Sequence, residues 1–168
     1  ILIGSPDIRV LSYGEDLKIV DWRNVMERVK AEKGVVAVAP FVLTQGVISA
    51  GHDYTEGAYI PRIEPQSRDV ASVTTIREHA IQGDFRFASS DGLQRGVVIG
   101  KLLAAKLNAY PGDTIVVITI AGTQVNRVTG SIVPRPVRFE VTGVFETGMY
   151  EYDNAYIYMS LASAQDLA

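Results

Sequence analysis

The apolar residues of this chain come in short runs that are rich in β-branched side chains and are broken by Gly, Pro and Asp. One of the longest, residues 115–121, contains a threonine and is far shorter than the roughly 20 apolar residues that a membrane-spanning helix needs. Short β-branched runs bounded by turn residues predict strands. We expect strands at residues 8–11, 35–43, 46–49, 58–63, 97–99, 114–120, 137–144 and 155–159, with residues 46–49 turning back on 35–43 as a hairpin.

Three helices are expected between these strands. The first begins after Asp21, a residue type that caps helices, and ends at Gly34; the second is Lys101–Leu107; the third begins after Ser160. The 3.6-residue spacing turns Trp22, Val25, Met26 and Val29 inward in the first helix and Leu102, Leu103 and Leu107 inward in the second. The predicted fold class is therefore α+β.

A change in composition predicts two lobes. Proline and charge density rise between Pro61 and Asp69, which is typical of a crossover between compact units. A chain of 168 residues is long enough for one domain or for two small lobes. The chain begins without methionine and ends inside an expected helix, so we expect it to be a piece of a longer protein.

Composition excludes several function classes. The formal net charge is −3 and no basic stripe is present, which argues against a nucleic-acid surface. The chain has no cysteine, so disulfides, thiolate nucleophiles and cysteine-based metal sites are excluded. No cofactor is expected.

The candidate catalytic groups do not form a recognisable pattern. His52 and His79 lack the i, i+4 spacing that places two metal ligands on one helix face. The segment from Gly96 to Lys101 has three residues between its glycines, one fewer than a phosphate-binding loop, and a leucine follows the lysine. Glu151 and Asp153 fall in one expected turn, where solvated or hydrogen-bonded acids are commoner than a catalytic pair. We expect no enzymatic activity.

The stretch between the expected strands 114–120 and 137–144 is the candidate site. Its prolines lack the backbone N–H that would donate a hydrogen bond to a neighbouring strand, and they stiffen the backbone. Arginines flank its apolar centre. Two interpretations stay open: a hairpin tip whose apolar residues fold back on the domain, or a protrusion that binds a partner and has interface composition. The candidate partner-binding residues are Gly130, Ser131, Ile132, Val133, Pro134, Arg135 and Pro136, with Arg127 and Arg138 at the rim.

The order of several motifs resembles the lipoprotein-releasing ABC transporter permease family (LolC/LolE type). The motifs are Gln82-Gly83-Asp84, Gly96-Val97-Val98-Ile99-Gly100 before a short helix, Pro111-Gly112-Asp113, Val133-Pro134-Arg135, and Val144 to Asp153 with Met149-Tyr150-Glu151-Tyr152-Asp153. The helix and strand between Trp22 and Pro40 fit as well, so the resemblance covers nearly the whole chain. Pro136, two residues after Pro134, departs from the family pattern and makes the loop stiffer.

This resemblance implies a two-lobed, MacB-like periplasmic domain on the periplasmic face of the inner membrane. It would have a β-α-β lobe made from both chain ends (residues 1–64 plus 143–168) and an inserted β-rich lobe (residues 65–142). The family's permeases work with a sister permease subunit and a cytoplasmic ATPase to extract lipoprotein cargo and pass it to a periplasmic carrier, LolA. Residues 130–136 match a hook-like loop offered to that carrier, and Arg138 is the expected place of a nearby contact patch.

Two alternative functions remain open at this stage. One is the ectodomain of a MacB/FtsX-type mechanotransmission permease of the same fold. The other is an enzyme, which the failed motif search disfavours. Within the family, the carrier-binding permease, its sister subunit and a fused type also stay open.

Overall fold

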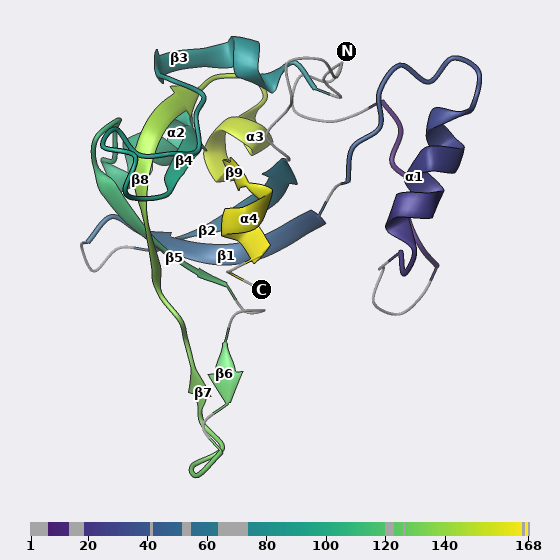
Figure 1. Ribbon diagram of the computed structural model, residues 1–168. Helices are drawn as coiled ribbons and strands as arrows, with labels where there is room; N and C mark the ends of the chain where they lie inside the picture. Colours follow the sequence, from purple (N-terminus) through teal and green to yellow (C-terminus); the bar gives the residue numbers. More distant parts are fainter. Residues whose placement is uncertain are drawn as a thin grey trace.

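A computed structural model describes residues 7–13, 19–40, 42–51, 55–63, 74–119, 123–125, 127–165 and 167. The expected α+β class is confirmed, with short helices on a mixed sheet (Figure 1). The elements in order are α1 (Trp22–Lys30), β1 (Val42–Ser49), β2 (Thr55–Ile63), the 3-10 helix η1 (Ile76–His79), β3 (Ala80–Gly83), β4 (Gly96–Gly100), α2 (Lys101–Leu107), β5 (Thr114–Thr119), β6 (Gln124–Val125), β7 (Ile132–Val133), β8 (Val137–Phe145), α3 (Tyr150–Ala155), β9 (Ile157–Ser160) and α4 (Leu161–Gln165).

Six strands of the large sheet close into a ring. Their order is β8-β4-β9-β2-β1-β5, and β5 pairs with β8 again. The N-terminal half of β8 pairs with β5, for example Val137 opposite Val117, and its C-terminal half pairs with β3, for example Phe145 opposite Ala80. Both halves of one β8 edge are therefore paired, while β4 takes the other edge from Glu140 to Phe145.

Alternating side chains divide between two apolar clusters. In β9, Ile157 and Met159 join the main core, whereas Tyr158 and the preceding Tyr156 join an aromatic cluster, as the sequence alternation predicts. The aromatic cluster also contains Phe145, whose ring meets that of Tyr158 edge-on at 5.2 Å between centroids. Burial raises the pKa of Tyr158, as expected for a phenol deep in an apolar cluster.

Several expected elements are confirmed. Helix α2 has the expected bounds, strand β4 is buried throughout, and Ser160 caps α4 because its hydroxyl accepts the amide hydrogen of Ser163 at 3.1 Å. Leu103 and Leu107 face inward, but Leu102 is 36% exposed, so its expected inward position is wrong. The helix α1 begins at Trp22 as expected but ends at Lys30, before the expected end at Gly34. The inward positions expected for Trp22, Val25, Met26 and Val29 are wrong, because α1 packs against no core and none of the four side chains is buried.

Three expectations about local structure are wrong. Residues 8–11 form no strand, and residues 35–40 are irregular, with β1 beginning only at Val42. Gly46, expected to follow a turn, lies inside β1, which pairs with β2 and β5. A Cβ at Gly46 would lie 2.9 Å from the carbonyl oxygen of Ile118, so the glycine permits a close approach between strands instead of a turn.

The expected turn at Met149 to Asp153 is a short helix, α3. Asp153 is only 5% exposed, and its carboxylate accepts the backbone N–H and the hydroxyl of Thr147, at 2.7 and 2.8 Å, and the N–H of Gly148 at 3.0 Å. These bonds fold the segment after β8 back onto the helix. The expectation of a hydrogen-bonded acid is therefore correct for Asp153.

The proposed lobes are not separated at the level of the sheet. Strand β1 pairs with β5 and β4 pairs with β9, so strands from residues 1–64, 65–142 and 143–168 share one sheet. The division at residues 64/65 and 142/143 stays a prediction. Helix α1 stands apart from the ring of strands (Figure 1) and has no buried residue.

Gly100→Ala is expected to destabilise the domain. A Cβ at this position would lie 2.3 Å from the carbonyl oxygen of Asp153, which is backbone and cannot move aside cheaply. We expect a loss of about 2–3 kcal/mol in the free energy of unfolding, measured by urea denaturation. Gly57→Ala is the control, because a Cβ there meets nothing within 4 Å. Equal stability of the two variants would show that β4 and α3 are not in contact.

Asp153→Asn is expected to cost about 1.5–3 kcal/mol, because an amide replaces a buried carboxylate that accepts three hydrogen bonds. The measurement is again urea denaturation. Glu151→Gln serves as the control, since Glu151 lies in the same helix and is exposed. A loss at Glu151 as large as that at Asp153 would contradict the assignment.

Candidate functional site

A two-stranded hairpin projects from one end of the ring of strands (Figure 1). Its strands β6 and β7 pair antiparallel, with Gln124 opposite Val133 and Val125 opposite Ile132. They form a separate sheet from the ring, because residues 134–136 between β7 and β8 belong to no strand. Pro134 and Pro136 supply no backbone N–H, so the ladder of β8 cannot continue through them into the hairpin.

The tip of the hairpin is closed by local polar contacts. Residues 127–129 form a turn, and Gly130 follows with a φ of +68°, a conformation that favours glycine. The hydroxyls of Thr129 and Ser131 are hydrogen-bonded at 2.8 Å, and the N–H of Ser131 donates to the Thr129 hydroxyl at 3.3 Å. The turn is thus stabilised by hydrogen bonds between its own residues.

The apolar residues of the hairpin that the structure describes face solvent. Val133 is 47% exposed, Pro134 and Pro136 are exposed, and Val128 at the tip is 93% exposed. The side chain of Ile132 lies outside the described residues. Exposed apolar side chains on a projecting hairpin argue against the interpretation in which they fold back on the domain.

The candidate residues divide into two groups in space. Gly130, Ser131, Val133 and Pro134 lie on the hairpin. Arg135, Pro136 and Arg138 instead line an open pocket of ≈410 Å³ at its base, together with Leu93 and Arg95. Arg138 is an exposed residue of β8 and lies opposite Val116 of β5.

Sequence reasoning missed three residues of this region. Val128 is the most exposed of the apolar side chains that the structure describes on the hairpin, and Leu93 and Arg95 lie more than 30 positions before it in the sequence. The position of Val128 beside Arg127 in the candidate stretch could have identified it. No sequence signal places Leu93 or Arg95 beside the hairpin, because the pairing of β4 with β8 creates that neighbourhood.

The candidate catalytic groups are not assembled in the described residues. Asp153 is buried in its hydrogen bonds, while Glu151 is exposed. Lys101 forms an ion pair with Glu146 at 2.7 Å, and Gly96 and Gly100 are held against other parts of the chain. His52 lies outside the described residues. Among those described, no group of three or more His, Asp or Glu side chains is placed to hold a metal ion.

The chain belongs to the family of MacB-like periplasmic core domains, whose family model matches residues 2–168. The resemblance inferred from the motifs is thereby confirmed. None of the helices in the described part of the chain has the length and apolar character to cross a membrane.

Two relatives share the same name, lipoprotein-releasing system transmembrane protein LolC. The one from Neisseria meningitidis serogroup B is 29% identical over 153 residues, which cover 88% of this chain and 34% of the relative. The one from Xylella fastidiosa strain 9a5c is 26% identical over 148 residues, covering 86% of this chain and 33% of the relative. The chain therefore spans about a third of the length of these relatives.

Pro134→Arg is expected to leave the domain folded. Pro134 is exposed on the hairpin and belongs to neither apolar cluster, so the free energy of unfolding should change by no more than about 0.5 kcal/mol. Urea denaturation checks this. A loss comparable to that of Gly100→Ala would show that the hairpin residues support the core.

Proposed function

We propose that this chain is the periplasmic domain of an inner-membrane ABC transporter permease that releases lipoproteins and passes them to a soluble, LolA-like carrier. The hairpin and its base are the docking site, and the domain itself has no catalytic role. The relatives named as lipoprotein-releasing proteins support the transporter class. The observation that carries the docking role is the projecting hairpin with exposed Val133 and Pro134.

The shape of the hairpin suits insertion into an apolar cavity. It extends away from the ring of strands, so a partner can surround it without contacting the core (Figure 1). Pro134 and Pro136 fix two φ angles, which lowers the ordering cost on binding. A short hairpin with exposed valines and prolines can thus supply much of the affinity of a small, transient interface.

The arginines at the base suit a polar rim around that apolar contact. Arg135 and Arg138 line the open pocket where the hairpin meets β8. Charged rim residues affect encounter rate and salt dependence more than affinity. Hence the apolar hairpin should supply most of the affinity, whereas the basic rim should mainly affect the encounter rate and its salt dependence.

Pro134→Arg and Val133→Asp are expected to weaken binding of the organism's own LolA-type carrier by about thirtyfold, or roughly 2 kcal/mol, because each places a charge in an apolar contact. Arg138→Ala should cost less, and the loss should shrink at high salt. Isothermal titration calorimetry at two salt concentrations measures both effects.

The control is Val36→Asp, which places a charge at an exposed valine on the segment after α1. Its affinity should match that of the unsubstituted domain. Unchanged affinity of Pro134→Arg would mean that the hairpin is not the docking element, and no binding by the unsubstituted domain would overturn the proposed function.

A further inference from the structure

The two strands that share one edge of β8 leave a gap between them. The β5 ladder covers residues 137–140 of β8 and the β3 ladder covers residues 143–145, so Val141 and Thr142 have no partner in either strand. On the other edge of β8, the register of β4 shifts at Thr142, which makes this residue a β-bulge. Bulges bend a strand and are common beside functional sites. A crevice of ≈270 Å³ lies at this gap.

The walls of the crevice are backbone segments held by hydrogen bonds. The N–H of Asp84 donates to the carbonyl oxygen of Thr142, and the N–H of Gly112 donates to that of Val141, both at 2.9 Å. The Thr142 hydroxyl donates to the carbonyl oxygen of Arg86 at 2.6 Å. The segment after β3 and the turn before β5 are therefore both fixed to β8, and the crevice between them is preformed.

Three charged side chains line this crevice, namely those of Asp84, Arg86 and Glu140. The side chains of Asp84 and Arg86 form no ion pair or hydrogen bond with any residue that the structure describes. The Glu140 carboxylate accepts the N–H and the hydroxyl of Ser90, at 3.1 and 3.2 Å, and a carboxylate has acceptor capacity beyond two bonds. Two carboxylates and one guanidinium are thus available to a ligand.

The size and charge of the crevice restrict what it can hold. Its volume is below the about 300–1,000 Å³ of sites for drug-sized ligands, so the ligand is a small molecule. Two carboxylates and one guanidinium give the lining a formal charge of −1, which favours a cation. Guanidinium groups pair with carboxylates, and carboxylates pair with ammonium groups. A molecule with two ammonium groups and one carboxylate matches all three side chains.

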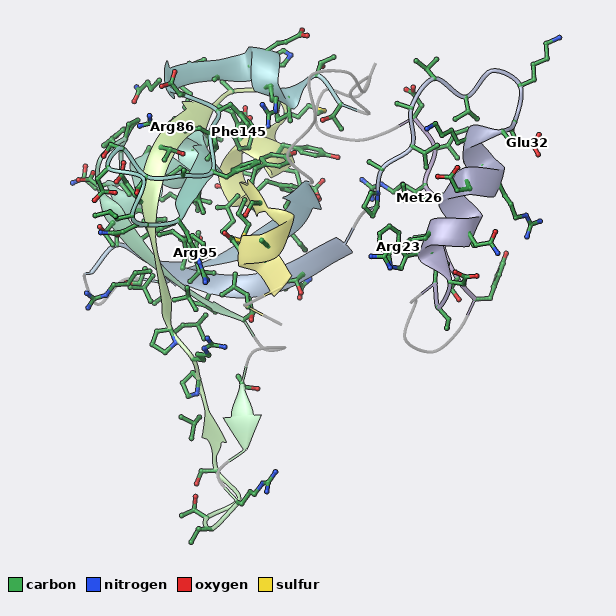
Figure 2. All side chains as sticks on the ribbon, in the orientation of Figure 1. Arg23, Met26, Glu32, Arg86, Arg95 and Phe145 are labelled. Atoms are coloured by element: carbon green, nitrogen blue, oxygen red, sulfur yellow. The ribbon has the colours of Figure 1, made fainter. Side chains whose placement is uncertain are left out.

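We propose that the crevice binds a free basic α-amino acid such as lysine. Its carboxylate pairs with Arg86, and its two ammonium groups pair with Asp84 and Glu140. No residue lines both this crevice and the pocket at the base of the hairpin, so the site does not rest on the docking proposal. Figure 2 shows Arg86 at the end of the ring away from the projecting hairpin.

A metal ion fits this crevice less well than an amino acid. Arg86 would repel a cation that has no carboxylate of its own. Calcium takes 6–8 oxygen ligands, whereas only two carboxylates line the crevice. Among the described residues, no group of three acidic or histidine side chains is placed to hold an ion there.

Titration of the domain with L-lysine tests the proposal. Amide chemical shifts of Asp84, Gly112 and Thr142 should change and reach saturation. The fold should also gain stability towards urea in the presence of the ligand, because the ligand binds only the folded chain. Shift changes that do not saturate, or that do not include these amides, would overturn the proposal.

Three related compounds identify which groups of the ligand are recognised. L-alanine lacks the second ammonium group, cadaverine lacks the carboxylate, and Nα-acetyl-L-lysine methylamide represents a lysine within a polypeptide. Each should bind at least about tenfold more weakly than L-lysine, since each leaves a charged side chain of the crevice without a partner. If the methylamide binds as tightly as L-lysine, the crevice recognises a protein side chain and the free amino acid is the wrong ligand.

Two variants test the assigned pairs. Arg86→Gln should lower the affinity for L-lysine about tenfold and leave that for cadaverine unchanged, because cadaverine has no carboxylate to lose. Asp84→Asn should lower the affinity for both compounds. An equal loss for both compounds in Arg86→Gln would contradict recognition of the carboxylate.

The matched controls are Glu78→Gln and Arg28→Gln, which remove one charge of each sign at exposed positions outside the crevice. Both should bind L-lysine as tightly as the unsubstituted domain does. A loss in Glu78→Gln as large as that in Asp84→Asn would show that L-lysine responds only to the overall charge of the domain, and the site would be wrong.

Discussion

The pairing of β8 on both edges is the interaction on which the rest of the structure depends. β4 lies along one edge, and β5 and then β3 occupy the other, so this single strand closes the ring. Close approaches confirm how tightly it is held: a Cβ at Gly143 would lie 2.6 Å from the carbonyl oxygen of Asp84. Closure leaves few unpaired strand edges, and it fixes where the chain leaves the sheet toward the hairpin.

The candidate site takes its position from that closure. An isolated two-stranded hairpin is marginally stable in water, and β6 and β7 are only two residues long each. Their base is set by the pairing of Val117 with Val137, the last pair of the β5–β8 ladder before the hairpin. Because Pro134 and Pro136 interrupt the ladder, the hairpin continues in the direction of β5 and β8 but is not part of the ring. The basic pocket lies at the same junction.

Local patterns in the sequence were enough to predict much of the fold but not its closure. The bounds of α2, the buried β4, and the alternation of Tyr158 with Met159 follow from spacing alone. The helix at Tyr150 was missed because the bonds to Asp153 that stabilise it come from Thr147 and Gly148 outside it. The hairpin was identifiable from its prolines and arginines. Leu93 was not, since a leucine carries no local sign of exposure and only the pairing of β4 with β8 brings it to the site.

Site-specific photocrosslinking tests the central claim most directly. A benzoylphenylalanine at Val133 of the full-length permease, irradiated in intact cells, is predicted to capture the LolA-type carrier, while the same group at Val36 is not. Both positions are accessible to solvent, so the comparison separates docking from exposure. Crosslinks from position 133 only to the permease itself, or equal capture of the carrier from both positions, would contradict the assignment of the hairpin as the docking element.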